Sequence, residues 1–423
     1  MSNTHVPRVA DHASWDLEQW LAHLAIIHPQ DIELGLERSA QVYSKLALNM
    51  TDKTVVTVAG TNGKGTTCAM LEQAMLLSGK SVAVYSSPHL IEYRERVRIN
   101  GQMLTEQRHC QAFEKVENVR GDTALTYFEF ATLAALQLMA DSPVEVLILE
   151  VGLGGRLDAV NIVEPNIAVI TSIDLDHQAW LGDNKEDIAR EKAGIFRTKV
   201  RAVIGELEPP QSLYEAASLY QIAGSWQGPD FGYTEDKQGF NWHNHHLSYE
   251  GLPLPHIPAQ NASTALQVID LLGLELDKAQ LTQLFAHTQL PGRRQIIQNK
   301  PMVILDVAHN PQATRYLAAQ ITKCEYRNLY LVTAMLADKD IQQSLSPLLN
   351  LSAHWLLASL DVPRGATSTH LNSVLDEGQK VLEFPDVSQA YCQALEMAKA
   401  DDLIVVFGSF FTVAEILKLS QKR

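Results

Sequence analysis

The segment 56–67 combines residue types that bind phosphate groups. It reads Val-Thr-Val-Ala-Gly-Thr-Asn-Gly-Lys-Gly-Thr-Thr, which predicts a strand, a glycine-rich turn and the start of a helix. Backbone N–H groups in such a turn converge at the positive end of a helix, and the glycines leave room for a phosphate. Lys64 adds a positive charge, and the hydroxyl of Thr66 is placed to reach a phosphate-bound magnesium ion. The pattern departs from G-x-x-x-x-G-K-[ST] at Val58 and Gly65, and a plain glycine turn is the alternative.

Polar residues follow three other apolar runs of the chain. They are 86–89 (Ser-Ser-Pro-His), 150–158 (Glu-Val-Gly-Leu-Gly-Gly-Arg-Leu-Asp) and 174–177 (Asp-Leu-Asp-His). In open α/β sheets ligands bind beyond the carboxyl ends of the strands, so these side chains are candidates to hold magnesium beside the phosphate loop. Magnesium prefers oxygen ligands, which makes His177 an unusual one. Glu150 as a loop or N-cap carboxylate, and His177 as a structural histidine, remain the alternatives.

Other chemically suggestive residues are weaker candidates. Lys192 lies near the end of a predicted helix, and composition alone favours an exposed surface lysine. The histidines of 243–246 have no acidic or cysteine partner at metal-ligand spacing, which favours an exposed turn. In the second half of the chain, 306–311 and 408–410 are also polar segments that follow apolar runs.

The elements that would position these residues alternate in type. Two amphipathic helices, 15–24 and 37–48, come first. Short apolar runs, which are typical of buried strands, then alternate with helical segments; the runs are 55–59, 81–86, 144–151, 167–172 and 202–205. This alternation predicts a parallel sheet covered on both faces. The stretch 227–254 changes character and is typical of antiparallel hairpins.

A candidate hinge, Leu290–Arg293, precedes a second alternating series, with strands expected at 302–307, 329–334, 355–358 and 403–407. We therefore expect an α/β protein of two domains. Residues 1–292 would form a large, mostly parallel-sheet phosphate-loop domain with a hairpin-rich insert near 227–254. Residues 293–423 would form a smaller Rossmann-like α/β domain.

Composition bounds the class of protein. The 423 residues are 46% hydrophobic and 20% charged, which is typical of a globular protein. The formal net charge of -15 argues against nucleic acid as a partner. The four cysteines are far apart, and neither a signal peptide nor a run long enough to span a bilayer is visible. We expect a cytoplasmic protein that binds neither nucleic acid nor membrane.

Six motifs occur in the order in which the Mur ligase superfamily has them. They are 60–66, 85–89, 149–158, 190–194, 290–293 and 306–311. With 33–36 and 125–129, they resemble the bacterial family of bifunctional dihydrofolate synthases/folylpolyglutamate synthases. The resemblance covers nearly the whole chain. It implies a ligase of folate biosynthesis and one-carbon metabolism that depends on ATP and Mg²⁺.

The resemblance also implies roles for individual residues. ATP would be bound by Thr61, Asn62, Gly63, Lys64, Gly65, Thr66, Asn261, Arg293 and Asp306. Magnesium would be held by Ser87, Glu150, His177 and Lys192, with Lys192 carbamylated. Lys64, Lys192, Arg293 and His177 would be catalytic. Dihydropteroate would be bound by Glu33, Leu34, Gly35, Leu36, Thr126, Tyr127, Phe128, Glu129, Leu157, Asp158 and Ala159, and L-glutamate by His309 and Ser409.

The implied reaction adds L-glutamate to dihydropteroate, and further glutamates to reduced folates, through an acyl phosphate. A monofunctional folylpolyglutamate synthase, or another Mur-type amide ligase, is the alternative. Peptidoglycan-type Mur ligases usually carry an additional N-terminal domain, for which the residues before the phosphate-loop strand are too few. A nucleotide-switched binding protein would not need Arg293 or the segment 306–311. We expect a monomer.

Overall fold

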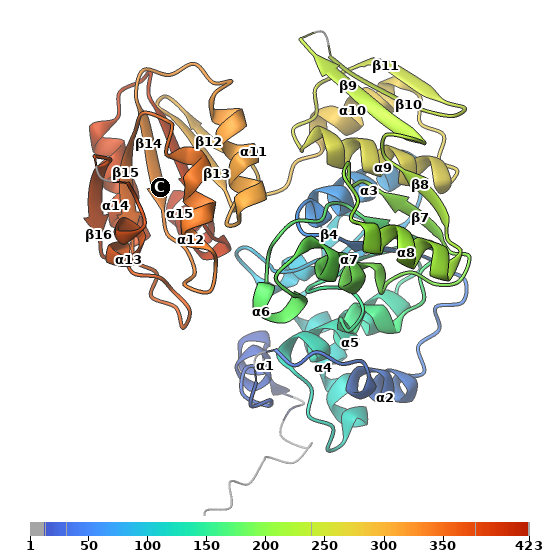
Figure 1. The fold of residues 1–423 in the computed structure, drawn as a ribbon. Coiled ribbons are helices and arrows are strands. Elements are labelled where there is room, and N and C mark those ends of the chain that lie inside the picture. The colour runs from blue at the N-terminus through green and yellow to red at the C-terminus, as the bar shows by residue number, and fades with distance from the viewer. Residues whose placement is uncertain (1–11, 13, 31, 238, 377, 422–423) are drawn as a thin grey trace, which may run out of the picture. The chain divides into compact units, whose positions relative to one another are not determined.

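The computed structural model describes residues 12, 14–30, 32–237, 239–376 and 378–421 (Figure 1). Its internal contacts divide the chain into two compact units. The first unit comprises Met1–Ile173 and Glu186–Thr288, and the second comprises Asp174–Lys185 and Gln289–Arg423. The predicted division into 1–292 and 293–423 stays a prediction, and the contacts group Asp174–Lys185 with the second unit. No helix of the described residues is long and apolar enough to cross a membrane.

The first unit is built on an eight-stranded sheet with the strand order β4-β3-β2-β5-β1-β6-β7-β8. The strands are β1 (Thr54–Ala59), β2 (Val82–Tyr85), β3 (Val97–Ile99), β4 (Gln102–Met103), β5 (Val146–Glu150), β6 (Ile167–Ile170), β7 (Arg201–Ile204) and β8 (Ala223–Trp226). All neighbouring strands are parallel except β2–β3 and β3–β4. The central strands β1, β5 and β6 are short, apolar and buried, as expected for strands covered on both faces.

The helices of the first unit follow the same alternation. They are α1 (Leu17–Leu24), α2 (Glu37–Leu46), α3 (Lys64–Leu77), α4 (Glu106–Arg120), α5 (Tyr127–Ala140), α7 (Lys185–Ala193), α8 (Gln211–Tyr220), α9 (Ala259–Leu271) and α10 (Lys278–His287). The connecting segments contain the short 3₁₀ turns η2 (Tyr93–Arg96) and η3 (Ala159–Ile162). The N-terminus of α5 is set by the local sequence, because Thr126 and Glu129 form a reciprocal capping box there.

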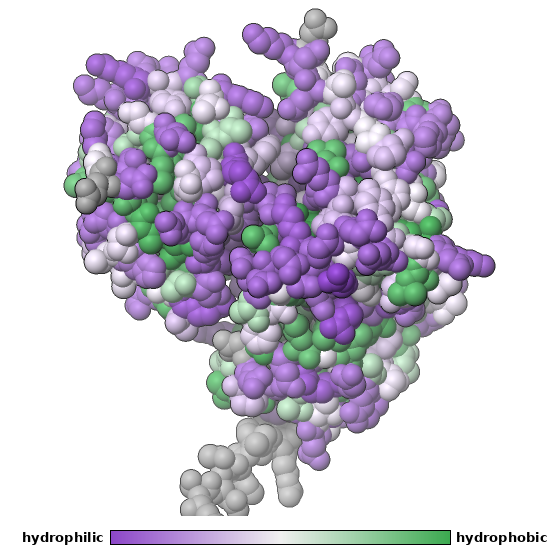
Figure 2. All heavy atoms as spheres, in the orientation of Figure 1, coloured by the Kyte–Doolittle hydropathy of each residue, from purple (hydrophilic) through white to green (hydrophobic). Residues whose placement is uncertain are grey.

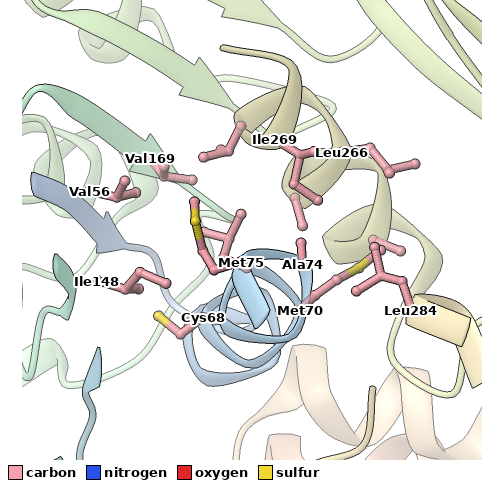
Figure 3. Packing of buried hydrophobic residues seen from close by; sticks show 14 of the residues in the cluster. Val56, Cys68, Met70, Ala74, Met75, Ile148, Val169, Leu266, Ile269 and Leu284 are labelled. Atoms are coloured by element: carbon pink, nitrogen blue, oxygen red, sulfur yellow. The ribbon is translucent and has the colours of Figure 1, made fainter. Parts of the chain in front are cut away.

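Helix α3 is packed between the sheet and two other helices (Figure 3). Cys68 and Met75 lie towards β1, β5 and β6, and Met70 and Ala74 lie towards α9 and α10. These four residues are at most 1% exposed. Because apolar residues surround α3, its start, which follows the glycine turn, is held rigidly by the core.

The stretch predicted to form hairpins does so. Strands β9 (Phe231–Asp236), β10 (Gly239–Asn244) and β11 (Ser248–Leu252) make an antiparallel sheet in the order β11-β10-β9. Its buried Phe231, Phe240 and Trp242 join the same core cluster as α3 and α9. His243 is exposed at the end of β10, and His245 and His246 lie in the turn between β10 and β11, as expected for an exposed turn. The Nε2 atoms of His245 and His246 lie 3.2 Å from carboxylate oxygens of Asp230 and Asp270, respectively.

The second unit has a six-stranded sheet with the order β12-β13-β17-β14-β15-β16. The strands are β12 (Gln295–Asn299), β13 (Met302–Asp306), β14 (Leu329–Thr333), β15 (Ala353–Ala358), β16 (Lys380–Phe384) and β17 (Leu403–Phe407). The helices are α6 (Gln178–Leu181), α11 (Pro311–Ile321), α12 (Ile341–Leu345), α13 (Ser368–Ser373), α14 (Val387–Met397) and α15 (Phe410–Gln421), with a 3₁₀ turn η4 (Ser346–Leu348). Only β12 is antiparallel to its neighbour.

The predicted fold class is confirmed: both units are α/β, and the central strands lie within a residue or two of their predicted bounds. The prediction missed five strands at or next to the edges of the two sheets, β3, β4, β8, β12 and β16. These strands are short or partly exposed, so they lack the continuous apolar run that marks a central strand. Hydrophilic residues cover most of the surface seen in Figure 2, with hydrophobic residues in small groups.

Candidate active site

The glycine turn 60–63 joins β1 to α3, as predicted. Gly63 is the N-cap of α3 at a φ of 87°, and Gly60 has a φ of 149°. A Cβ on Gly60 would lie 1.9 Å from Oγ1 of Thr171. The turn is tied to the end of β6, because Thr61 N–H donates to the Ser172 carbonyl at 2.8 Å. The start of α3 therefore presents its backbone N–H groups in a fixed arrangement.

Two polar side chains shape the turn from inside. Lys64 Nζ donates to the carbonyls of Gly60 (2.8 Å) and Thr61 (3.2 Å), so its charge is held over the loop. Asn261 of α9 donates from Nδ2 to Oγ1 of Thr66 at 2.9 Å. A Cβ on Gly63 would lie 2.5 Å from Oδ1 of Asn261. The structure thus brings Asn261, which is distant in sequence, to the phosphate loop.

Glu150 ends β5 beside the phosphate loop. Its backbone pairs in register with Val58 of β1, and the residue is 5% exposed. Its Oε2 accepts a hydrogen bond from the backbone N–H of Ser87 at 3.3 Å. A buried carboxylate and a neighbouring serine hydroxyl are oxygen donors of the kind that Mg²⁺ and Mn²⁺ prefer.

Lys192 is not the surface residue that composition favoured, because it is only 4% exposed. It lies in the last turn of α7, against the loop that follows Glu150. A Cβ on Gly155 would lie 2.8 Å from the Glu191 carbonyl oxygen and 2.9 Å from that of Lys192. The backbone N–H of Arg156 donates to the Glu191 carbonyl at 2.7 Å. The loop and the end of α7 therefore form one packed layer in the first unit.

Three segments assigned to the acceptor meet around α5. Arg38 Nη2 donates to Glu129 Oε1 and to the carbonyl oxygen of Glu33, each at 3.0 Å. The ring of Phe128 lies against the glycine-rich segment 152–156 after Glu150 (the glycine loop). A Cβ on Gly152 would be 2.5 Å from Phe128 Cζ. These contacts join the segments 33–36, 126–129 and 150–159 in one unit. Tyr127 faces Arg96, whose guanidinium carbon lies 5.5 Å from the ring centroid.

Asp158 is a buried carboxyl group of this acceptor region with a raised pKa. It is 3% exposed, and burial raises its pKa to about 6. The backbone N–H groups of Leu153 (2.8 Å) and Val160 (3.0 Å) donate to its carboxylate and oppose that rise. The side chain therefore fixes the 153–160 loop and adds a carboxylate next to Leu157 and Ala159.

A cavity of about 780 Å³ adjoins this region, and Glu33 and Arg38 are among its lining residues. Its other lining side chains include His28, Lys45, Arg120 and Asp122. Glu33 forms an ion pair with Arg38, and its Oε2 lies 3.2 Å from Nε2 of His28. The lining is thus mainly charged, and much of its charge is paired within the protein.

His177 lies on the segment that groups with the second unit. It has a φ of 50°, and its Nε2 lies 3.3 Å from Lys339 Nζ. Lys339 also pairs with Asp176 at 2.7 Å, and Asn310 donates to the other Asp176 oxygen at 2.9 Å. Although burial alone raises the pKa of Asp176, the charge of Lys339, followed by His177 and His309, holds it below its usual range.

Asp306 and Arg293 lie together in the second unit. Asp306 ends β13, and its carboxylate accepts from the backbone N–H groups of Arg294 (3.0 Å) and Ala308 (2.8 Å). Burial raises the pKa of this carboxyl, and the charge of Arg293 opposes the rise. The Arg293 guanidinium carbon lies 4.9 Å from the Phe410 ring centroid. This stacking orients the arginine at the carboxyl end of the sheet.

His309 and Ser409 follow the neighbouring strands β13 and β17. His309 Nδ1 donates to the Val307 carbonyl at 2.8 Å, and burial lowers the pKa of His309 to about 4. Its ring is therefore neutral at pH 7. Ser409 is 3% exposed, and its Oγ accepts from the backbone N–H of Thr412 at 3.0 Å. Both residues lie at the carboxyl ends of adjacent parallel strands.

Sequence reasoning did not single out Lys339, Asn310, Arg96 or Asn161. Lys339 follows β14 in the run Leu336–Asp340, so the rule that ligands lie beyond strand ends could have found it. Asn310 was noted only as part of a polar segment. Arg96 and Asn161 carry no such signal, because only the fold shows what they contact.

Among the residues that the structure describes, no three His, Cys, Asp or Glu side chains gather closely enough to hold a metal ion. A cation beside Ser87 and Glu150 would therefore complete its coordination with other oxygens. Oxygens of nucleotide phosphate and of water are suitable donors. Ser87 and Glu150 thus fit a hard divalent cation that nucleotide and water also bind, rather than a cation bound by protein side chains alone.

The chain matches two family models and many known proteins. Residues 58–217 match the Mur ligase middle domain, and residues 292–410 match the glutamate ligase domain of Mur ligases. The chain is 44% identical over 412 residues to the dihydrofolate synthase/folylpolyglutamate synthase of Escherichia coli (strain K12). That alignment covers 97% of each chain.

Two solved structures show how far the similarity extends. One is E. coli FolC in complex with DHPP and ADP, with a TM-score of 0.94 and 43% identity over 99% of this chain and 100% of that one. The other is a bifunctional folylpolyglutamate synthase/dihydrofolate synthase with Mn, AMPPNP and L-glutamate bound. Its TM-score is 0.91 at 43% identity, over 99% of this chain and 100% of that one. With the phosphate loop and two α/β units in place, this chain belongs to the dihydrofolate synthase/folylpolyglutamate synthase family.

Proposed function

We propose that this chain adds L-glutamate to dihydropteroate, which forms dihydrofolate, and adds further glutamates to reduced folates. As a family member it is an ATP-dependent ligase. The observation that carries the proposal is the phosphate loop beside the buried Glu150, in a chain that is 44% identical over 97% of its length to a relative named for both activities.

The chemistry requires an activated carboxylate. A carboxylate is a poor electrophile, so the γ-phosphoryl of ATP is first transferred to it, giving an acyl phosphate and ADP. The glutamate amine then attacks the carbonyl carbon, and phosphate leaves. Phosphoryl transfer depends on positioning and charge neutralisation, which a rigid loop with a lysine supplies. The complexes of relatives with ADP and AMPPNP support this role.

The ATP phosphates would be held by Thr61, Asn62, Gly63, Lys64, Gly65 and Thr66. Their support is the fixed turn at the start of α3. Asn261 would share this site, since it already contacts Thr66. Arg293 and Asp306, which interact in the second unit, would contact ATP as well. Arg293 would stabilise the transferring phosphoryl group, because a stacked guanidinium is well oriented for phosphate oxygens.

Ser87, Glu150, His177 and Lys192 would hold the divalent cation, which we propose to be Mg²⁺. When bound, the ion neutralises phosphate charge and orients the γ-phosphoryl. Ser87 and Glu150 already contact each other in the first unit. Manganese in a related structure supports a divalent ion.

Lys192 would act as a carbamate, formed by CO₂ on its Nζ. The burial of this lysine against the loop that follows Glu150 supports the idea, because it favours a role inside the site over that of a solvated surface charge. Carbamylation replaces the cation with an anionic oxygen ligand, which suits a place beside Glu150.

The acceptor would lie among three segments: Glu33, Leu34, Gly35 and Leu36; Thr126, Tyr127, Phe128 and Glu129; and Leu157, Asp158 and Ala159. Their support is the set of contacts that joins these segments around α5. Asp158, whose pKa is raised to about 6, would offer its carboxyl to the polar edge of a pterin. L-glutamate would be bound by His309 and Ser409.

The remaining proposals concern the molecule's setting. We propose a cytoplasmic monomer with small-molecule substrates and no nucleic-acid or membrane partner. The net charge of -15 opposes nucleic-acid binding. The cysteines Cys68, Cys110, Cys324 and Cys392 are free, as is usual in a reducing compartment.

Product mass spectrometry tests the main proposal. The protein is incubated with ATP, Mg²⁺ and L-glutamate, and with either dihydropteroate or tetrahydrofolate. A mass gain of one glutamate in both reactions is expected. Gain with tetrahydrofolate alone would indicate a monofunctional folylpolyglutamate synthase, and would contradict the dihydropteroate site. No gain in either reaction, with ATP still hydrolysed, would indicate another Mur-type amide ligase.

A further inference from the structure

Asn161 joins the loop that carries the proposed acceptor residues to the end of α7, which carries the proposed metal ligand Lys192. Asn161 lies in η3, two residues after the acceptor segment Leu157–Ala159, and is 4% exposed. Its Nδ2 donates to the Arg156 carbonyl at 3.1 Å and to the Gly194 carbonyl at 3.0 Å. One side-chain amide thus binds the backbone of the glycine loop and the backbone that follows α7.

The orientation of this amide is fixed by Arg197. Arg197 Nη2 donates to Asn161 Oδ1 at 3.1 Å and to the Asn161 carbonyl at 3.0 Å. Oδ1 is therefore the acceptor, and both hydrogens of Nδ2 are used on the two carbonyls. An aspartate would have the same shape but no donor for either carbonyl.

The glycine loop and the C-terminal end of α7 are in contact beside Lys192. A Cβ on Gly194 would lie 2.3 Å from Cβ of Arg156, and one on Gly155 would lie 3.1 Å from Cα of Lys192. The carbonyls at the end of a helix have no partner within the helix. Here Asn161 Nδ2 and Arg197 Nη1 (3.1 Å) both donate to the Gly194 carbonyl. Together with the bond from Arg156 N–H to the Glu191 carbonyl, the amide of Asn161 ties the end of α7 to the loop.

We infer that Asn161 is a positioning residue, which fixes the position of Lys192 relative to the loop that runs from Glu150 to Ala159. This inference rests on the proposed function, in which Lys192 is a metal ligand and the loop binds the acceptor. Asn161 is not among the residues to which the proposed function assigns substrate or metal contacts. It acts through the backbone of Arg156 and Gly194, and so links the acceptor site to the cation site.

The test is the Mg²⁺ affinity of Asn161→Asp, measured by calorimetric titration of the protein with Mg²⁺ in the presence of ADP, together with the Mg²⁺ dependence of glutamate ligation. Partners behind metal ligands are typically worth about 10- to 100-fold in affinity or activity. We expect the half-saturating Mg²⁺ concentration to rise about ten-fold and kcat to fall by a similar factor. The KM for L-glutamate should stay constant, because its proposed contacts lie elsewhere. Asn166→Asp is the control for the change of amide to carboxylate at an exposed position: Asn166 Oδ1 accepts from Val55 N–H at 2.7 Å, a bond that aspartate keeps.

An Asn161→Asp protein that is folded and has the Mg²⁺ dependence of the wild type would overturn the inference, whatever its kcat. If this variant does not fold, Arg197→Met replaces it, since it removes the donor that orients the Asn161 amide and also the Nη1 donor to the Gly194 carbonyl, while Asn161 itself is unchanged. Its half-saturating Mg²⁺ concentration should rise too, and an unchanged value would equally reject the role. Failure of the proposed function is separate, because it would show as absent ligation in the wild type or full activity in Lys192→Ala.

Discussion

Lys64, Lys192 and His109 are polar side chains whose surroundings decide what they do. Lys64 is held over the phosphate loop by two carbonyls of that loop. Lys192 is buried against the loop that follows Glu150. His109, away from the candidate site, is buried in α4 against the edge of Tyr93. Each of them therefore gives a prediction that a single substitution can test.

Lys64→Ala should abolish ATP-dependent ligation, with a loss of at least about 100-fold in kcat, because a charged donor to the transferring phosphoryl is lost. The unfolding temperature should change little, since the side chain lies in a loop-to-helix junction. Steady-state ligation and thermal unfolding measure the two effects. Lys80→Ala, at an exposed ion pair with Glu145, is the control. A large fall in unfolding temperature would show that Lys64 is structural.

Lys192→Ala should lose most of its ligation activity, about 100-fold, because the substitution removes a proposed metal ligand. Added formate or acetate should restore part of it, since a short carboxylate fits the space left by the buried side chain. Activity is measured against carboxylate concentration. Wild-type activity in this variant would remove Lys192 from the site, and no rescue would count against the carbamate.

His109 should make the protein less stable in acid. Burial, with the charges of Arg94 and Arg108, lowers its pKa from 6.5 to about 4. Between these values the unfolded chain binds the proton and the folded chain does not, so stability falls as the pH falls. In His109→Phe, the loss of unfolding free energy between pH 7.5 and pH 5 should be smaller by about 1–2 kcal/mol. An identical loss in both proteins would refute this assignment.

At the scale of elements, α3 matters most, because it joins the core to the phosphate loop. Its apolar residues face the sheet on one side and α9 and α10 on the other (Figure 3). A helix fixed on both sides cannot shift without disturbing the core. The same helix α9 carries Asn261 to the loop, so packing and the site are coupled.

Met75→Ala should lower the free energy of unfolding by about 2–5 kcal/mol, as is usual when a buried side chain leaves a cavity. Met75 is 1% exposed in the cluster around α3. Denaturant unfolding at equilibrium measures the change. The control is Met103→Ala, because Met103 is 44% exposed and its loss should cost less than about 0.5 kcal/mol. Equal effects of the two substitutions would contradict the packing argument.

At the scale of the whole molecule, the segment Asp174–Lys185 is notable because it leaves the first unit and groups with the second. Asp174 pairs with Arg315 at 2.6 Å, and Asp176 pairs with Lys339 at 2.7 Å. Lys339 and Asp176 are both nearly buried, so this pair is shielded from solvent. The segment that carries the predicted ligand His177 is therefore held by α11 and by the loop that follows β14.

Lys339→Met should speed amide hydrogen exchange in Asp174–Lys185, because it leaves Asp176 buried with its main countercharge removed. Exchange measured by mass spectrometry should rise about ten-fold or more in this segment and stay constant in β14. Lys185→Met is the control, since the exposed Lys185–Asp174 pair is worth little. Unchanged exchange in Lys339→Met would show that the segment is held by other contacts.

The local sequence determined much of this protein. Short apolar strands alternating with helices specified two α/β units, because such strands are stable only in a sheet covered on both faces. The glycine turn, Lys64 and the start of α3 could be read from residues 56–67, since a strand-turn-helix junction depends on neighbouring residues. Polar residues after apolar runs marked Glu150, His177 and Asp306.

Tertiary structure decided what distant residues do together. Lys192 was ambiguous in sequence, and only the packing of α7 on Gly155 shows that it is buried. Asn261 reaches Thr66, and Asn161 joins two loops, through contacts between residues far apart in the chain. The edge strands were missed because partial exposure leaves no apolar run. Local patterns record propensity and burial, whereas the identity of a partner is set by how the elements pack.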